Sequence, residues 1–379
     1  MLDAIIRGGH VIDPAQGIDG IKDIAVKNGH IVAPETNVEA IHEINAEGCY
    51  VFPGLIDGHT HSYFWGSGLG VQPDLFASAG VTTIVDAGTA GWSNYHAFHN
   101  TSIVNSIVRV KSLVAYNNSG QVELGENLSY DTSQIKRQKI RDVIEHYRGE
   151  VLGLKILFQR EFIKDDPETC LEGLIEVAEE CKCMITVHTT NPPIPVHDIL
   201  KHLRAGDVYC HCYQGRGYTI LNASGSVDNS VWAARKRGVL FDAANGTNNF
   251  AFSTAIPAIK SGFLPDIISS DNASNSFCWD RYAKNLPFVM SKYLALGMTL
   301  RDIVACTTEK PAAMLGMHGK IGTLSEGAIA DITIMKLVPK HEVFWDSVKA
   351  DTSAVKGNYI LVPQMTFING MPVYRLNSF

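Results

Sequence analysis

Two histidines separated by one residue, His59 and His61, follow a short apolar run over residues 51–56. In an extended strand, residues i and i+2 point to the same face, so both imidazoles can reach one ion. The spacing therefore predicts part of a metal site at the carboxyl end of a strand. The rest of the chain must then supply the other ligands.

Polar residues also occupy or end several other apolar runs: Lys155, His188, His211 and Asp271. Taken singly, each has an ordinary structural explanation, since a histidine after a strand is commonly a satisfied core residue and an aspartate commonly caps the next helix. Taken together, four histidines and one aspartate at matching strand ends supply nitrogen and oxygen ligands that zinc accepts.

The elements that must position these residues alternate between strand and helix. Helical patterns, at 131–147, 168–181, 195–203 and 231–237, separate most of the β-rich runs. Eight such runs are expected, at 54–59, 81–87, 112–116, 151–157, 184–188, 208–213, 239–243 and 266–271. Repeated βα units predict parallel strands, and eight of them predict an α/β fold of the (β/α)8 TIM barrel type, which places catalytic residues at the carboxyl ends of its strands. A doubly wound open sheet is the alternative, but the glycine-rich phosphate-binding fingerprint that such a sheet often carries is absent.

Both ends of the chain have a different texture, with short strands separated by turn signals such as Asn28-Gly29 and Asn369-Gly370. Neither end has enough apolar surface to form a core alone. We therefore expect residues 1–52 and 320–379 to form one split, small β-sandwich domain. Residues 53–319 would then form the barrel.

Composition excludes several classes of protein. The net charge of −7 argues against a nucleic-acid partner, and no apolar run approaches the length of a membrane span. The first residues lack the pattern of a secretory signal, and eight cysteines are too few for a disulfide scaffold, so a cytoplasmic location is expected. Cys210 and Cys212 flank His211, but in a strand they would point away from it, which favours packed apolar roles.

The segment Pro53-Gly54-Leu55-Ile56-Asp57-Gly58-His59-Thr60-His61 resembles the signature of the amidohydrolase superfamily. Residues 307–316, 322–324 and 327–331 look like its usual return to the β-domain, so the resemblance covers nearly the whole chain. Within the superfamily the chain is similar to dihydroorotase-like members with two metals. Residues 80–88, 206–212 and 285–298 look most like the deacetylases of N-acetyl-D-amino acids and acetylated 2-hydroxy acids.

The resemblance implies two Zn²⁺ ions held by six residues: His59, His61, Lys155, His188, His211 and Asp271. His59, His61 and Asp271 would hold one ion, and two histidines the other. Lys155 would bridge the ions as an N-carboxylated lysine, because a plain ammonium between two dications would be repelled whereas a carbamate offers one oxygen to each. Burial readily lowers the pKa of a lysine, which suits it to this modification.

The implied reaction is hydrolysis of an acetyl amide or ester of a small carboxylic acid, such as an N-acetyl-D-amino acid or an acetyl-(R)-2-hydroxy acid. A hydroxide shared by the zinc ions would attack the carbonyl, with Asp271 as general base and then general acid. This deacetylase and esterase would act on a small-molecule substrate, with homo-oligomer formation left open. Asn118, Arg160 and Tyr213 are candidate substrate contacts, for which a solvated or structural role is at least as common.

Three alternatives remain. Purine-base (adenine) deamination occurs on related barrels, although typical base deaminases of this fold use one metal without such a lysine. Cyclic-amide hydrolysis, as by dihydroorotase, would share the metal site and differ in pocket residues. A binding or scaffold protein would usually have lost ligands. Asn245 stands where related chains often have a histidine, which puts the inferred substrate, but not the metal site, in question.

Overall fold

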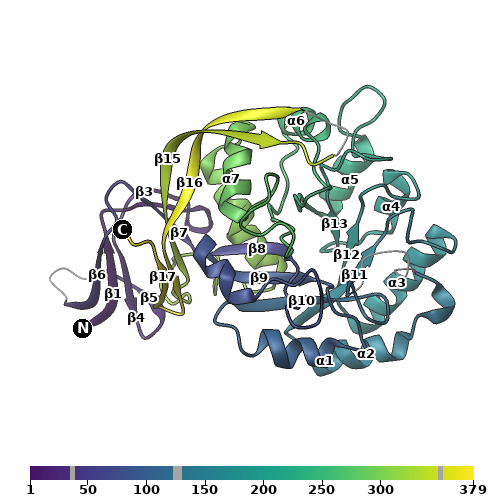
Figure 1. Ribbon diagram of the computed structural model, residues 1–379, viewed down its shortest axis with the longest axis horizontal. Coiled ribbons are helices and arrows are strands. Elements are labelled where there is room, and N and C mark those ends of the chain that lie inside the picture. Colours follow the sequence, from purple (N-terminus) through teal and green to yellow (C-terminus); the bar gives the residue numbers. More distant parts are fainter. Residues whose placement is uncertain (35–38, 123–129, 349–352) are drawn as a thin grey trace.

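A parallel sheet of seven strands curves into the barrel that forms the larger part of the molecule (Figure 1). The computed structural model describes residues 1–34, 39–122, 130–348 and 353–379. The strands pair in chain order: β8 (Leu55–Thr60), β9 (Val81–Ala87), β10 (Arg109–Ala115), β11 (Val151–Leu157), β12 (Met184–His188), β13 (Val208–Cys210) and β14 (Leu240–Asp242). All seven residues of β9 are buried, as expected for a strand covered on both faces.

Helices lie outside the barrel: α1 (Tyr95–Phe98), α2 (Arg137–His146), α3 (Pro167–Cys181), α4 (Val196–His202), α5 (Asn229–Arg237), α6 (Phe252–Lys260), α7 (Leu286–Ala295), α8 (Leu300–Thr307) and α9 (Glu309–Met314). Helix α3 shows why they form. Asp166 caps its start by accepting a hydrogen bond from Thr169 N, and Leu171, Leu174 and Val177 bury one face. None of the described helices is long and apolar enough to cross a membrane.

The barrel closes through an irregular segment where the sequence predicts an eighth regular strand. Asn245 N donates to Ser269 O over 3.1 Å, and Asp271 N donates to His59 O over 2.9 Å, so residues 269–271 bridge the first and last strands. Ser270 N instead donates to a side chain, the Asp57 carboxylate, over 2.9 Å. The predicted (β/α)8 architecture is confirmed, but side-chain acceptors interrupt its last ladder.

Two further sheets, built from both ends of the chain, form the predicted sandwich. One contains β1 (Leu2–Arg7), β4 (Ile24–Lys27), β5 (His30–Val32) and β6 (Ala40–Asn45). The other contains β2 (His10–Asp13), β3 (Ile18–Ile21), β7 (Tyr50–Pro53), β15 (Ile332–Trp345), β16 (Ala354–Ile368) and β17 (Met371–Arg375). Ala4 and Ile6 from the first sheet share one apolar core with Val51, Ile334 and Phe367 from the second.

Strands β15 and β16 are much longer than the sequence pattern predicts, and their outer halves leave the sandwich and cross α7 (Figure 1). We call this part, residues 338–348 and 353–361, the C-terminal arm. Phe344 packs against Phe288 of α7 with ring centroids 5.0 Å apart. Beyond it, Ser347 Oγ accepts a hydrogen bond from Phe250 N over 2.8 Å. The arm therefore holds a loop of the barrel that follows β14.

Candidate active site

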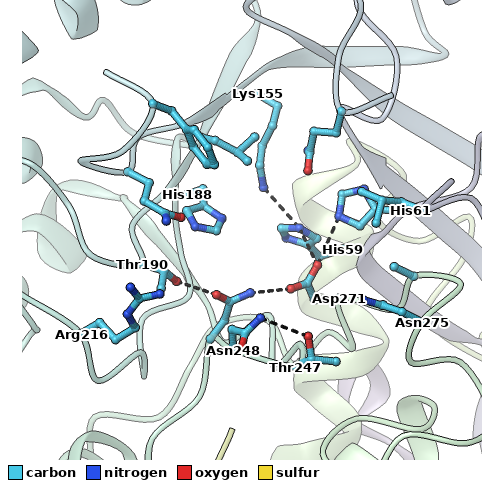
Figure 2. Close-up of a pocket in the computed structure, with 17 residues that line it drawn as sticks. His59, His61, Lys155, His188, Thr190, Arg216, Thr247, Asn248, Asp271 and Asn275 are labelled. Carbon is cyan, nitrogen blue, oxygen red and sulfur yellow. Dashed lines mark hydrogen bonds and ion pairs between the residues drawn. The ribbon is translucent and has the colours of Figure 1, made fainter. Parts of the chain in front are cut away.

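A cavity of about 300 Å³ opens at the carboxyl ends of the barrel strands. Five of the six predicted ligands line it: His59, His61, Lys155, His188 and Asp271 (Figure 2). His211 lies next to them, with its ring centroid 4.3 Å from that of His188. The structure thus brings together six residues from different strand ends that are up to 212 positions apart, from His59 to Asp271. The volume suits a small molecule.

His59, His61 and Asp271 form the first half of this cluster. Asp271 Oδ1 lies 3.4 Å from His59 Nε2 and 3.3 Å from His61 Nε2. His61 Nδ1 lies 2.9 Å from the Thr89 hydroxyl, which itself donates to Asp86 over 2.8 Å. Because that hydroxyl proton is used, Nδ1 of His61 must be the donor, and Nε2 keeps its lone pair. An outer hydrogen bond of this kind orients a metal-binding histidine.

His188, His211 and Lys155 form the second half. Nε2 of both histidines is buried and has no hydrogen-bond partner in the part of the chain that the structure describes. His211 Nδ1 donates to Ala244 O over 2.7 Å, which leaves the Nε2 lone pair available. Two buried imidazole nitrogens without partners among the described residues, next to each other, fit a metal ligand set.

Lys155 is 1% exposed, and its Nζ lies 3.3 Å from His59 Nε2. Among the described residues, no carboxylate lies within ion-pair distance of it. A buried ammonium whose neighbours are the His59 imidazole and the Cys210 thiol lacks the partner that a charge needs at such a place. The position suits a neutral amine or an anionic derivative of it.

The protonation states of the cluster agree with metal binding. Burial holds the pKa of His59 and of His188 well below the ordinary value, and it lowers the pKa of His211 to about 3. Burial alone would raise the pKa of Asp271, but the adjacent His59 and His61 outweigh it, so that pKa lies below the ordinary value. At neutral pH these three imidazoles are therefore neutral, and Asp271 is a carboxylate.

The turn at His211 differs from the sequence prediction. Strand β13 ends at Cys210, and His211 has a left-handed backbone with φ of 64°. Strand alternation does not apply across this turn, so Cys210 and His211 both face the cluster. Cys210 Sγ lies 3.2 Å from His59 Nδ1, and the prediction that this cysteine packs away from the site is wrong. Cys212 does lie in the apolar core.

Asn249 is a site residue that sequence reasoning missed. Its Nδ2 donates to Asp271 Oδ2 over 2.8 Å, and its Oδ1 accepts from the Thr190 hydroxyl over 2.8 Å. One oxygen of Asp271 thus faces the histidines while the other is held by an amide. Gly246 permits this approach, because a Cβ there would overlap Asp271 Oδ2. The available signal was the turn-forming run of residues 245–249 after a strand.

The three predicted substrate contacts do not line the cavity. Tyr213 is fully buried and donates to Phe263 O over 2.6 Å, so it belongs to the core behind the site. Asn118 is exposed in a turn where its carbonyl accepts from Ser93, and Arg160 is exposed with its guanidinium 3.5 Å from a backbone carbonyl, Pro193 O. Each of the three lies beyond the end of its strand, where strand alternation no longer determines the direction of a side chain. The nearby lining residues are instead Arg216, Thr247, Asn248 and Asn249.

Asn245 lies behind the cavity rather than in its lining. Its Nδ2 donates to Ser269 O over 3.0 Å, and its Oδ1 accepts from Lys292 Nζ over 3.1 Å. Lys292 is fully buried, 4.3 Å from the centre of the Phe250 ring. Burial lowers the pKa of Lys292 to about 7. Asn245 therefore braces the irregular closing segment against α7.

Comparison with known proteins agrees with this geometry. Residues 50–373 match the model of the amidohydrolase family. The chain belongs to this family. A deacetylase from Agrobacterium fabrum is 29% identical over 318 residues, which cover 83% of this chain and 76% of the relative. A deacetylase from Enterococcus faecalis is 30% identical over 307 residues, which cover 79% of this chain and 81% of the relative.

A crystal structure of an adenine deaminase superposes with a TM-score of 0.89 at 27% identity, covering 99% of this chain and 100% of that one. The matched lengths include both the barrel and the sheets from the termini. The resemblance to amidohydrolases, and to their deacetylases in particular, is confirmed, and the protein is a member of a family of hydrolases.

Proposed function

We propose that this amidohydrolase is a zinc-dependent deacetylase that cleaves the acetyl amide or ester of a small carboxylic acid, such as an N-acetyl-D-amino acid or an acetyl-(R)-2-hydroxy acid. The observation that carries the proposal is the buried cluster in which orphaned imidazole nitrogens adjoin Lys155 and a histidine-flanked carboxylate. The similarity to two proteins named as deacetylases supports the acetyl group as the part removed.

The donor set matches two ions. His59, His61 and Asp271 would hold one, and His188 and His211 the other. Lys155 would join them after its neutral amine adds to carbon dioxide, forming an Nζ–C bond and releasing one proton, to give a carbamate. When bound, zinc would polarise the acyl carbonyl and lower the pKa of water to about 7. Neutral imidazoles and a carboxylate are the protonation states that such ions require.

Asp271 is the residue placed to move the proton. Its Oδ2 is fixed by Asn249, and the carboxylate lines the cavity where a substrate carbonyl would lie. As a general base it takes the proton of the attacking water, and as a general acid it delivers that proton to the leaving nitrogen or oxygen. Amide and ester hydrolysis share this sequence, so one site can perform both.

The decisive experiment is an acetate-release screen with the zinc-loaded protein over N-acetyl-D-amino acids, their L-enantiomers and acetylated 2-hydroxy acids. We expect turnover with at least one class, loss of turnover after chelation, and recovery with zinc. Metal analysis of Lys155→Ala should show less bound zinc than the parent. Zinc-loaded protein that releases acetate from none of these compounds would contradict the proposal.

Adenine deamination is the second candidate, because the adenine deaminase structure matches nearly the full length of the chain. It would release ammonia rather than acetate. Cyclic-amide hydrolysis would release neither, and opening of a ring such as dihydroorotate would be followed by absorbance. The same protein sample, assayed for all three products, separates these activities.

A further inference from the structure

We propose that Arg216 binds the carboxylate of the substrate and so selects acetylated acids over neutral acetyl compounds. This inference rests on the proposed deacetylase function and names the residue that recognises the substrate. Arg160, a candidate substrate contact from the sequence, does not line the cavity, whereas Arg216 does. Figure 2 draws Arg216 on the side of the cavity opposite His61 and Asn275.

The charges of the lining favour an anion near Arg216. Among the described residues that line the cavity, Lys155 and Arg216 carry the ordinarily cationic side chains, and Asp271 the carboxylate. Lys155 is buried within the histidine cluster, so it does not face a substrate group away from the cleaved bond. Arg216 is the remaining cation, in a wall that otherwise offers the neutral groups of Thr190, Asn248 and Asn249.

Arg216 also differs from the arginines that serve the fold. Arg204 donates to Asp207 through two nitrogens and to a backbone carbonyl, and Arg235 lies 3.8 Å above the centre of the Phe263 ring while donating to a carboxylate. The Arg216 guanidinium has one ionic contact within the described chain, with Glu161 Oε1 at 3.5 Å. A guanidinium carries five N–H donors, so most of this one is available to a ligand.

The backbone beneath Arg216 is fixed. Arg216 N donates to the buried Gln214 side chain over 2.6 Å, and that side chain in turn donates to Tyr218 O over 2.7 Å. Gly215 packs so tightly that a Cβ there would lie 2.5 Å from Ala251 Cβ. A loop held in this way presents its side chain to a ligand at little cost in ordering.

Glu161 is a weak competitor for the guanidinium. Both side chains of the pair are 44% exposed, and an exposed pair of this length contributes little. A substrate carboxylate can instead approach the planar guanidinium with two oxygens, the bidentate geometry that arginine provides and lysine does not. Glu161 also accepts from Asn191 Nδ2 over 3.0 Å, so it stays in place when Arg216 turns to a ligand.

The test compares Arg216→Met, Arg216→Lys and the matched control Arg160→Met in the zinc-loaded protein. Because hydrogen bonds to charged groups are strong, we expect Arg216→Met to raise KM for the best acetylated acid by about 10- to 100-fold, with kcat nearly unchanged. Arg216→Lys should recover part of the loss. Arg160→Met should match the parent protein.

The primary amide of the same acetylated acid lacks the negative charge. Parent and Arg216→Met are therefore both assayed with the acid and with the amide. We expect its KM to be high in the parent and unaltered by Arg216→Met. An equal rise of KM for the acid and the amide, or an unchanged KM for both, would overturn the role of Arg216. Calorimetric binding of the deacetylated acid gives a second reading that does not need turnover. If the parent binds it but releases no acetate, the deacetylase proposal fails, and the binding of the acid to Arg216→Met still decides the inference.

Discussion

The two sides of the cavity are built differently. The metal-side cluster, namely His59, His61, Lys155, His188, His211 and Asp271, comes from strand ends and is almost completely buried. The substrate-side wall, namely Thr190, Arg216 and residues 247–249, comes from loops, and all of it except Thr190 is partly or fully exposed. Strands of a closed barrel constrain position far more than loops do, so the first side suits chemistry that must be held fixed and the second suits recognition that can vary between relatives.

Asn249 joins the two sides, because it belongs to the wall and holds the Asp271 carboxylate. If the division is correct, changes in the cluster lower kcat, changes in the wall raise KM, and Asn249 is the exception. Three substitutions test this, and a fourth tests the packing behind the wall, in decreasing order of expected effect.

Asp271→Asn should have the largest effect. Loss of a positioned general base and acid is expected to lower kcat by about 1,000-fold, while KM changes little. The amide keeps the shape of the carboxylate, so circular dichroism should match the parent, and metal analysis should still find at least one bound ion. Full turnover of this variant would remove Asp271 from the reaction.

Asn249→Ala should lower kcat by about 10- to 100-fold, as expected for loss of an outer contact to an active carboxylate. Asn248→Ala is the matched control, since Asn248 lines the cavity but, among the described residues, its amide contacts Thr247 alone, over 3.4 Å. The control should leave kcat unchanged. Equal losses in the two variants would show that loop disturbance, rather than the bond to Asp271, is responsible.

Ser347→Ala tests the support of the wall. It leaves the buried Phe250 N–H without its side-chain acceptor, which should lower the free energy of unfolding by about 1–2 kcal/mol and raise KM several-fold. Chemical denaturation and steady-state kinetics measure the two effects. Ser78→Ala removes an exposed hydroxyl that donates to Leu75 O, and should change neither. A loss of stability without any change in KM would show that the C-terminal arm does not support substrate binding in the cavity.

Lys292→Met tests the packing behind the wall through the pH dependence of the free energy of unfolding. The folded-state pKa of Lys292 is about 7 and its ordinary value is 10.5, so between these values the unfolded chain holds a proton that the folded chain lacks. The stability of the parent should therefore rise with pH in this window, by up to about 1.4 kcal/mol per pH unit from this group. The variant should lose that component in denaturation curves from pH 7 to 9.5. If the free energy of unfolding changed with pH equally in the parent and the variant, the pKa of Lys292 would not be lowered in the folded protein.

The same division explains what the sequence could predict. His61 follows a strand, and His59, Lys155 and His188 lie within or end one, so the alternation of apolar runs is enough to place them at one end of a barrel. Arg216 and Asn249 lie in loops after strands, where no periodicity determines the direction of a side chain. Tyr213 shows the same limit, since two residues after His211 the chain has already returned to the core.

Irregular backbone accounts for other differences. Asp57 accepts the hydrogen bond from Ser270 N that a neighbouring strand would otherwise accept. The eighth segment therefore lies where a strand is expected but does not form a regular strand ladder. The left-handed turn at His211 reverses the facing of Cys210. The apolar pattern does not predict the full length of β15 and β16, because exposed polar residues such as Lys340 and His341 interrupt it.

The C-terminal arm has a consequence for how the protein matures during synthesis. The barrel strands and every residue of the metal-side cluster emerge from the ribosome before residue 272, yet Asp346 and Ser347, which hold the segment at Phe250 and Phe252, emerge much later. A nascent chain halted between these points would contain all residues of the metal-side cluster. It would lack the part of the C-terminal arm that holds the segment next to the substrate-side wall. We therefore expect selectivity for the substrate to be the last property that a growing chain acquires.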